Sequence, residues 1–283
     1  MNSLLIGIFD GFHIGHRRLI EKAAKERKKK GKTILLTFPY PPEFYFSLGK
    51  DFGGLIYPPD IKRELANKVG VDEVYFLDFE KIKDYSPYAF LEYLKKNYDP
   101  SSITVGFNFR FGKNKSGNSQ FLKNEGKKFG IQANIIPPAF FKGQKVSSTL
   151  IRHFIRCGNI SLANSMLSSP YLFRGTYNLS EKSISRNNSF LVTPKEGFYL
   201  IFSKKGGPAI VRGPEKKEPK STKNLISFTV MKGLGNPLKK DIFEEFQFLD
   251  LLDDNKLSFF IKKIGDTEKS RENREIGRWT YGF

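Results

Sequence analysis

Cysteine is almost absent from the sequence, since Cys157 is the single one among 283 residues. The chain therefore forms neither an internal disulfide framework nor a cysteine-rich zinc site, and a reducing compartment suits it. Long hydrophobic runs are also missing, because no stretch reaches the roughly 18 apolar residues that a membrane-spanning helix needs. The first residues carry neither a basic lead nor a small-residue cleavage site, the marks of a secretory signal. We expect a soluble, cytoplasmic protein without a membrane partner.

Acidic residues are too few to balance the basic ones: 29 Asp and Glu face 48 Lys and Arg, a formal net charge of +19. Clustered cations bind nucleic acid by displacing counterions from its phosphates. Here the lysines are scattered along the chain, and the densest run, residues 25–30, falls where a helix is expected to end and where cations suit the helix dipole. We therefore do not expect nucleic acid to be the main partner. A positive field attracts small anions such as nucleotides equally well.

The first half alternates two hydrophobic periodicities. Compact apolar runs typical of strands cover residues 3–9, 33–38, 73–79, 102–106 and 131–136. Helical spacing marks residues 16–30, 60–69 and 119–129, and Ser86 followed by Pro87 marks the start of a further helix. Strands that alternate with helices predict an α/β fold with a doubly wound, Rossmann-like parallel sheet, whose ligands bind at the carboxyl ends of the strands.

After about residue 168 the pattern changes to short strand-like runs separated by glycine, proline and lysine turns. The runs cover residues 197–203, 208–211 and 225–230. Residues 244–264, which include Leu249, Leu251 and Leu252, show helical spacing. We therefore expect a first domain over residues 1–168 and a smaller, mostly β, barrel-like domain over residues 169–283 with a C-terminal helix.

Two of the three histidines, His13 and His16, lie three residues apart in a turn after the first strand-like run. Gly11 and Gly15 in this turn let the backbone approach a phosphate, and the start of the following helix supplies unpaired N–H groups and partial positive charge. Two imidazoles there can donate hydrogen bonds to the nonbridging oxygens of a phosphoryl group under attack. Preorganised donors of this kind lower a barrier by about 3 kcal/mol each. The turn is a candidate phosphate site.

Other interpretations of the histidine pair stay open on these residues alone. With Asp10 the two rings would form half of a zinc site, but no further His or Cys stands nearby to complete a tetrahedron. A nucleophile and base pair would need a serine or cysteine, and the turn contains neither. Ordinary surface histidines would have no reason to fall between a strand and a helix start.

The stretch GIFDGFHIGH, residues 7–16, resembles the signature of the HxGH nucleotidylyltransferase superfamily, and its full ten-residue form is similar to that of the bacterial FAD synthetases, the FMN adenylyltransferases. Three further segments follow in the order of that family: TFPYPP at residues 37–42, GFNFRFG at 106–112 and VSSTLIR at 146–152. Each lies at the end of an expected strand or the start of an expected helix. The resemblance covers residues 1 to about 156.

The resemblance implies an adenylyl transfer from ATP to FMN that gives FAD and pyrophosphate, with Mg²⁺ accompanying ATP and with no metal ligand assigned to the protein. It implies that His13 and His16 contact the ATP phosphates and stabilise the transition state, with Arg152 as a third catalytic residue. It implies an ATP site completed by Gly7, Phe9, Asp10, Gly11, Gly15, Ser147, Ser148 and Thr149. Ser and Thr at a helix start expose hydroxyl and N–H groups together, and arginine offers a planar fork to phosphate oxygens.

The FMN side of the site is implied by the same resemblance to include Asn108, Phe38, Tyr40 and Pro42. Many relatives have an aspartate and a histidine after the second strand, where this chain has Phe38-Pro39-Tyr40-Pro41-Pro42. Aromatic residues are plentiful nearby and are candidates for walls around an isoalloxazine ring. These candidates are Phe44, Tyr45, Phe46 and Tyr57.

The second half resembles the riboflavin kinase that is fused to most bacterial FAD synthetases, but two features of that kinase are missing. Its Gly-x-Pro-Thr-Ala-Asn segment occurs neither in residues 176–190 nor elsewhere, and residues 226–230 contain no glutamate. We expect a degenerate barrel without kinase activity. Another nucleotidylyltransferase with a different acceptor, or a noncatalytic flavin- or nucleotide-binding protein, are the alternatives for the whole chain. No oligomeric state follows from the sequence.

Overall fold

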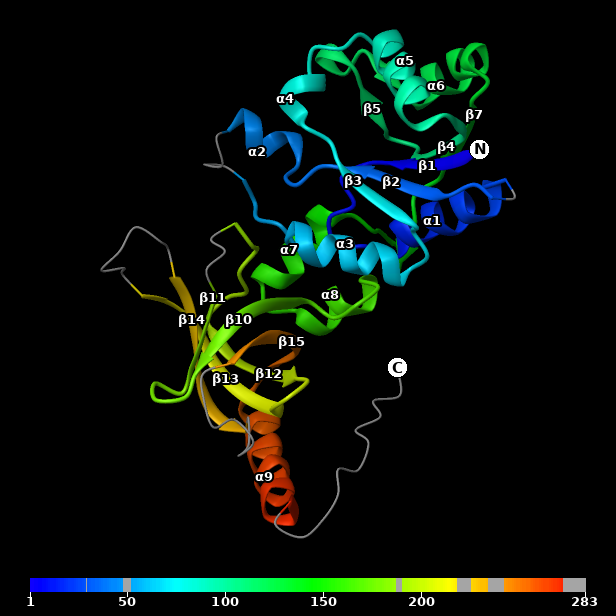
Figure 1. Ribbon diagram of the computed structural model, residues 1–283. Coiled ribbons are helices and arrows are strands. Elements are labelled where there is room, and N and C mark those ends of the chain that lie inside the picture. The colour runs from blue at the N-terminus through cyan, green and yellow to red at the C-terminus, as the bar shows by residue number, and fades with distance from the viewer. Residues whose placement is uncertain (29, 48–51, 187–189, 218–224, 234–241, 272–283) are drawn as a thin grey trace. The chain divides into compact units, whose positions relative to one another are not determined.

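The computed structural model describes residues 1–28, 30–47, 52–186, 190–217, 225–233 and 242–271 (Figure 1). The chain divides into two compact units, which are described separately below. Residues Met1–Arg152 and Met166–Ser169 form the first, and His153–Ser165 and Pro170–Phe283 form the second. The functional domain limits expected from the sequence, 1–168 and 169–283, stay a prediction.

A five-stranded parallel sheet forms the centre of the first unit, in the order β3-β2-β1-β4-β7. Its strands are β1 (Asn2–Ile6), β2 (Thr33–Thr37), β3 (Glu73–Phe76), β4 (Pro100–Gly106) and β7 (Gln132–Ile136). The three central strands are buried along almost their whole length, as expected for a parallel sheet with both faces covered. The sheet confirms the doubly wound α/β prediction. Because the chain continues from β1 to β2 on one side and later adds β4 on the other, the carboxyl end of β1 lies at a topological switch point.

Helices cover both faces of this sheet. Figure 1 shows α5 and α6 on one side of it and α1 and α3 on the other. The helices of the first unit are α1 (Ile14–Glu26), α2 (Pro42–Phe46), α3 (Pro59–Lys68), α4 (Phe79–Ile82), α5 (Pro87–Tyr98) and α6 (Ser119–Glu125), with 3₁₀ turns at Lys113–Lys115 and Gly126–Phe129. Leu4 and Ile6 of β1 share one buried cluster with Phe90 and Leu94 of α5. Short hairpins are formed by β5 (Arg110–Phe111) with β6 (Gly117–Asn118) and by β8 (Phe140–Phe141) with β9 (Gln144–Lys145).

Local signals explain where the helices begin. Ser86 caps α5 by accepting a hydrogen bond from the Ala89 N–H at 3.1 Å, and Pro87 occupies the first helical position, as the sequence predicts. Helix α1 starts two residues earlier than expected, at Ile14, because His13 is its cap. Residue 29, in the expected helix 16–30, lies outside the described residues. The chain passes from the first unit to the second within α7 (Ser148–Arg156).

The second unit is a closed six-stranded barrel in the order β10-β11-β14-β13-β12-β15, with every neighbouring pair antiparallel. This confirms the barrel-like prediction. The strands are β10 (Leu172–Asn178), β11 (Ser183–Arg186), β12 (Gly197–Ser203), β13 (Gly207–Lys217), β14 (Leu225–Gly233) and β15 (Ile242–Leu252). Buried rings of Phe173, Phe228 and Phe248 pack together in its interior, with ring centroids 5.2 to 5.6 Å apart. Helices α8 (Ile160–Met166) and α9 (Asp254–Arg271) complete the unit.

The helical prediction for residues 244–264 is wrong over its first half. Residues up to Leu252 belong to β15, and α9 begins only at Asp254. Phe246 and Phe248 are buried at alternate positions, the period-two pattern of a strand. The leucines at 249, 251 and 252 happen to fit a helical spacing as well, and pairing with β10 and β12 decides between the two. The expected C-terminal helix is present, with Ile264 packed on the barrel.

Candidate functional site

The turn after β1 is a left-handed bend that requires glycine at position 11. Phe9, Gly11 and Phe12 have φ values of 49°, 95° and 42°. A Cβ on Gly11 would lie 2.9 Å from Ile56 Cδ1, so both its backbone angle and its packing favour glycine. The Asp10 side chain is fully buried and accepts hydrogen bonds from the backbone N–H groups of Ile56 at 2.9 Å and Tyr57 at 3.3 Å. The turn is thus fixed by the protein and requires no ligand to hold it.

His13 ends this turn as the N-cap of α1. Its Nδ1 accepts a hydrogen bond from the His16 N–H at 3.3 Å. Because Nδ1 accepts, the neutral ring carries its proton on Nε2. Gly15 leaves room for this ring, since a Cβ there would lie 3.0 Å from His13 Cε1. The arrangement directs a hydrogen-bond donor, rather than a lone pair, away from the helix.

The imidazoles of His13 and His16 stack face to face, with ring centroids 3.7 Å apart and planes inclined by 15°. His16 also stacks on the Phe9 ring at 4.6 Å. Burial lowers the pKa of His13 to about 4. Burial, followed by the neighbouring His13 and Lys62, lowers the pKa of His16 well below its usual value. Both rings are therefore neutral near pH 7 and act as hydrogen-bond donors, in agreement with the chemistry of an anion site.

The Nδ1 atom of His16 is buried and has no hydrogen-bond partner among the residues that the structure describes. Buried polar atoms are nearly always satisfied, so this nitrogen is an exception within the fold. The α1 N-terminus adds its backbone N–H groups to the same place. The pair of rings and the helix start therefore lie together as the candidate anion site.

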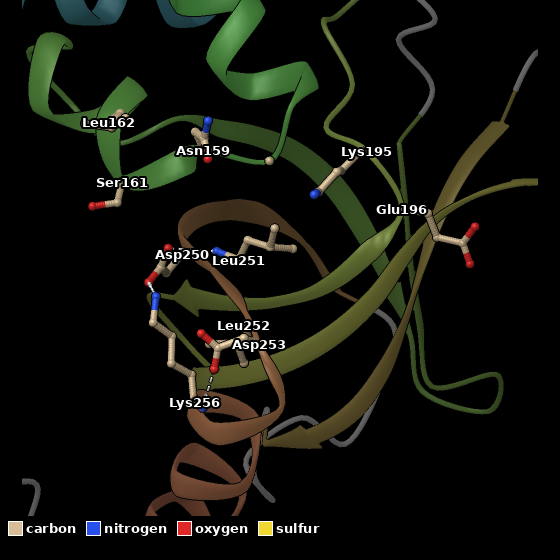
Figure 2. Close-up of a pocket in the computed structure, with 11 residues that line it drawn as sticks. Asn159, Ser161, Leu162, Lys195, Glu196, Asp250, Leu251, Leu252, Asp253 and Lys256 are labelled. Atoms are coloured by element: carbon tan, nitrogen blue, oxygen red, sulfur yellow. Dashed lines mark hydrogen bonds and ion pairs between the residues drawn. The ribbon is translucent and has the colours of Figure 1, made fainter.

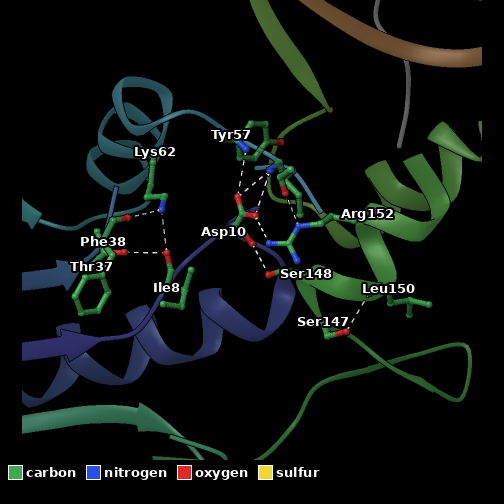
Figure 3. A network of polar contacts seen from close by, with 12 residues as sticks. Ile8, Asp10, Thr37, Phe38, Tyr57, Lys62, Ser147, Ser148, Leu150 and Arg152 are labelled. Carbon is green, nitrogen blue, oxygen red and sulfur yellow. Dashed lines mark hydrogen bonds and ion pairs between the residues drawn. The ribbon is translucent and has the colours of Figure 1, made fainter. Parts of the chain in front are cut away.

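A polar network next to the histidine turn joins it to α7 (Figure 3). Arg152 bonds the Asp10 carboxylate through Nη2 at 2.7 Å and donates from Nε to the Gly54 carbonyl at 2.7 Å. The Ser148 hydroxyl donates to the Asp10 carbonyl oxygen at 2.7 Å. The structure therefore brings the expected residues Asp10, Ser148 and Arg152 together, and it shows Arg152 and Ser148 bound to the turn itself.

The remaining residues of the helix-start segment are also placed at the first turn of α7. The Ser147 Oγ accepts from the Leu150 N–H at 3.2 Å, which is a cap contact, and the Thr149 side chain is exposed. Gly7 lies at the end of β1, where its N–H donates to the Leu36 carbonyl at 3.2 Å. The ATP-side residues expected from the sequence thus lie on the β1 turn and on α7.

Residues expected on the FMN side lie at the ends of β2 and β4. Tyr40 stacks on Phe44 at 4.2 Å, Phe38 packs edge-on against Phe79, and Pro42 is the first residue of α2. Asn108 follows β4 with its side chain exposed. These residues follow two different strands of the same sheet edge, and no direct contact between Asn108 and the others is seen among the described residues.

Tyr57 does not line a flavin pocket. Its ring is fully buried in the first unit and its hydroxyl donates to the Ser169 carbonyl at 2.7 Å. Phe46, by contrast, is 72% exposed, and Phe44 and Tyr45 are partly buried. The aromatic candidates next to Tyr40 are therefore Phe44, Tyr45 and Phe46.

Lys62 is absent from the residues that the sequence predicts for the site, and the structure places it there. Its Nζ donates to the carbonyl oxygens of Ile8 at 3.1 Å and Phe38 at 2.9 Å (Figure 3). Thr37 adds a hydroxyl bond to the Ile8 carbonyl at 2.8 Å. The available signal is the position of Lys62 within the buried stripe of α3, where it follows Ile61 and lies a turn before Leu65 and Ala66.

The second unit contains a cavity of about 480 Å³, bounded by residues near the start of α8, the end of β15 and the start of α9 (Figure 2). Asp250 and Lys256 of its lining form an ion pair, while Glu196 pairs with Arg212 outside the lining. Lys256 bonds Asp250 through Nζ at 2.9 Å, and its N–H donates to the Asp253 carboxylate at 2.9 Å. Strand β14 contributes Ser227 and Phe228 to the buried part of the barrel.

Within the described residues no three His, Cys, Asp or Glu side chains gather as they would around a metal ion. In the same part of the chain, no helix combines the length and the apolarity required to cross a membrane.

A parallel α/β sheet that presents a helix N-terminus, two neutral imidazoles and a serine-started helix at its switch point has the arrangement of a Rossmann-like nucleotide-binding protein. The FAD synthetase family model matches residues 2–150, more than half of the sequence. The chain therefore belongs to the FAD synthetase family.

Individual relatives agree with this assignment. A bifunctional riboflavin kinase/FMN adenylyltransferase of Bacillus subtilis is 26% identical over 72% of this chain and 68% of its own length. A second bifunctional enzyme of this kind, from Listeria monocytogenes, is 30% identical over 70% of this chain and 66% of its own length. An FAD synthetase of the same organism is 28% identical over 61% of this chain and 70% of its own length. The matches thus span about two thirds of these relatives.

A solved structure supports the architecture. It is described as a macrolide-efflux protein from Streptococcus pneumoniae and superposes with a TM-score of 0.73 at 21% identity, covering 97% of this chain and 95% of that one. At this identity the likeness concerns the fold alone.

Proposed function

We propose that the chain joins ATP and FMN by direct in-line displacement. A phosphate oxygen of FMN attacks the α-phosphorus of ATP, the bond from that phosphorus to the oxygen of the β-phosphate breaks, and FAD and pyrophosphate form. FMN enters with its phosphate already ionised, so the step needs no general base, and no covalent enzyme intermediate is required. Membership of the FAD synthetase family supplies the reaction class. Positioning and charge stabilisation by the residues of the site account for the rate.

The observation that carries the proposal is the pair of stacked, neutral imidazoles at the α1 N-terminus. The bond from the His16 N–H to His13 Nδ1 leaves the His13 Nε2–H free to donate. Negative charge grows on the nonbridging oxygens of the α-phosphate as it becomes five-coordinate, and donors from His13 and His16 stabilise it. Each such donor lowers the barrier by about 3 kcal/mol.

The residues on α7 hold the triphosphate from the other side in this proposal. Ser147 and Thr149 offer hydroxyl groups, and the start of α7 offers backbone N–H groups. Ser148 and Arg152 hold this segment against the histidine turn through their bonds to Asp10 and Gly54, and the guanidinium N–H groups of Arg152 that these bonds leave are directed to phosphate oxygens. Asn108, Phe38, Tyr40 and Pro42 form the FMN side.

Mg²⁺ enters as part of the substrate Mg-ATP. The histidine turn, residues 7–16, contains one carboxylate, Asp10. Its oxygens already accept from the Ile56 and Tyr57 N–H groups and from Arg152. This carboxylate is therefore engaged, and the phosphate oxygens of ATP are the ligands that carry the ion.

The second unit is proposed to lack riboflavin kinase activity, with functional domains over residues 1–168 and 169–283. The support is the missing Gly-x-Pro-Thr-Ala-Asn segment and the absence of a glutamate from residues 226–230. Asp250 and Lys256 of its cavity are moreover paired with each other. The single Cys157 fits a reducing, cytoplasmic setting for the protein.

The test is to incubate the pure protein with Mg-ATP and either FMN or riboflavin, and to separate riboflavin, FMN and FAD by chromatography. FAD from FMN, with no FMN from riboflavin, is the expected result. His16→Ala should lower turnover about 100-fold, since it removes one preorganised donor, while the far-UV circular dichroism spectrum is unchanged. Wild-type turnover in that variant contradicts the mechanism, and ADP formation that depends on riboflavin contradicts the loss of kinase activity.

A further inference from the structure

Lys62 is a fully buried lysine whose ammonium group bonds only backbone carbonyls. Its side chain has no exposed surface, and it donates to Ile8 and Phe38. Among the described residues it forms no ion pair, and the carboxylate that attracts it, Asp10, is already bonded to Arg152. Buried lysines without a carboxylate partner are rare because desolvating the charge is unfavourable. A specific gain has to offset that penalty.

The two carbonyls belong to the two loops that build the site. Ile8 lies just after β1, between the last sheet bond, Gly7 N–H to Leu36 at 3.2 Å, and the left-handed bend that begins at Phe9. Phe38 lies just after β2. Beyond Gly7 the β1 chain leaves the sheet, and the bonds from Lys62 and from the Thr37 hydroxyl replace the sheet bonds there.

We propose that Lys62 is a positioning residue for the nucleotidyl-transfer site: it holds the loop that carries His13 and His16 at a fixed place against the loop that carries Phe38 and Tyr40. This inference rests on the proposed function, because the first loop is the ATP side of the site and the second is the FMN side. Lys62 itself contacts neither substrate. It sets the distance between the parts that do.

The charge of Lys62 also acts on the histidines. It is one of the causes that lower the pKa of His16, so it helps to keep that imidazole neutral and able to donate. Asp10 offsets Arg152, which leaves the ammonium as the surplus positive charge of the network, and a buried surplus cation favours an anionic substrate.

Lys62 loses this charge within the working pH range of an enzyme. Burial lowers its pKa to about 8, with Asp10 raising it and Arg152 lowering it. The other groups that face it are the His16 imidazole and the carbonyls of Ile8 and Phe38, none of which is negatively charged. Because a neutral amine binds the Ile8 and Phe38 carbonyls more weakly than an ammonium does, we expect activity to fall as Lys62 loses its proton.

Three variants test the proposal by FAD formation from FMN and Mg-ATP. Lys62→Met removes the donors and the charge at similar length, and Lys62→Arg keeps both in a group that stays protonated. Arg63→Met is the matched control, because Arg63 lies next to it on α3 and donates to the Val74 carbonyl of β3, away from the histidines. Lys62→Met should lower kcat about 10- to 100-fold, the effect of displacing catalytic groups by a fraction of an ångström to one ångström. Arg63→Met should stay within twofold, and Lys62→Arg should recover part of the rate.

A second readout needs no turnover. The chain has three histidines, so a spectrum of its imidazole groups by NMR contains three sets of signals. His153→Gln and His13→Asn identify two of them and leave the third to His16. In Lys62→Met the His16 signal should shift and its pKa should rise, while Arg63→Met leaves it unchanged. If wild-type protein makes no FAD, the proposed function fails, but this NMR comparison still decides whether Lys62 acts on His16.

The outcomes separate a positioning role from a merely structural one. A folded Lys62→Met with wild-type kcat and an unchanged His16 signal overturns the proposal. If Lys62→Met does not fold, Lys62→Arg decides through the pH profile, because an arginine cannot lose its proton. The activity loss near pH 8 should then move to higher pH, and a profile identical to that of the wild type overturns the proposal.

Discussion

His13 uses one ring nitrogen for the fold, and the proposed function gives the other to the ligand. Its Nδ1 caps α1 through the His16 N–H, and its Nε2 carries the proton. The two tasks can be separated because asparagine is a good helix cap but has no group in the position of Nε2–H. The two tasks therefore predict that replacing His13 by alanine and by asparagine will affect stability differently.

His13→Ala should lose both tasks, and His13→Asn only one. Loss of the cap costs about 1 kcal/mol of stability, so His13→Ala should unfold at lower urea concentration than the wild type, and His13→Asn should restore most of that loss. Both variants should be defective in FAD formation. Urea unfolding and the chromatographic assay measure the two effects, and an active His13→Asn would show that the ring donor is not needed.

The lowered pKa of His13 predicts a pH dependence of stability. Above pH 6.5 the ring is neutral in both the folded and the unfolded chain, so it adds no pH dependence to the free energy of unfolding. Between pH 6.5 and about 4 the unfolded ring binds a proton that the folded ring does not, so the free energy of unfolding falls as the pH falls. The slope contributed by this one group is at most about 1.4 kcal/mol per pH unit. Urea unfolding at pH 7, 6 and 5 measures it, and His13→Asn should show a shallower slope; equal slopes would contradict the assignment.

At the scale of the element, the start of α1 has opposite requirements for helix stability and for the position of the His13 ring. Gly15 is a helical residue, and alanine in its place would favour the helix by about 1 kcal/mol. The added Cβ would, however, lie 3.0 Å from His13 Cε1 and 3.1 Å from its Nδ1. An alanine side chain at position 15 would stabilise the helix, but the His13 ring would have to move to make room for it.

Gly15→Ala should therefore leave the melting temperature unchanged or higher while it lowers kcat. Glu21→Ala, an exposed substitution on the same helix, is the control for general effects of alanine and should alter neither quantity. A melting temperature that falls together with kcat would mean that the glycine serves the fold rather than the catalytic geometry.

Elements with strong local signals were predictable from the sequence, and those decided by distant partners were not. Ser86 with Pro87 marks α5 because the cap and the proline act within one turn. The start of α1 was expected two residues late because histidine is an unusual cap. Residues 244–252 fit a helix by spacing, and only pairing with β10 and β12, about 70 and 50 residues earlier along the chain, makes them a strand. The candidate site was predictable through its glycines and histidines, whereas Lys62 depends on a packing contact between α3 and two loops.

At the scale of the whole molecule, the surplus of positive charge acts on substrates before they reach the site. A formal net charge of +19 and two anionic substrates predict association that is steered by the field of the protein. Such steering is screened by salt, because the Debye length shortens from about 10 Å at 0.1 M to about 3 Å at 1 M. The donors at His13 and His16, by contrast, act at contact distance, where salt screens little.

Raising the ionic strength should therefore lower kcat/KM for Mg-ATP and leave kcat nearly constant. Initial rates of FAD formation between 50 mM and 500 mM KCl measure both constants, with Mg²⁺ kept in excess so that ATP stays complexed. The same series with His16→Ala should show the same relative fall in kcat/KM, since the field belongs to the whole chain and the histidine to the chemical step. A fall in kcat with an unchanged KM would place the salt effect at the site itself and would remove any role for the overall charge in substrate capture.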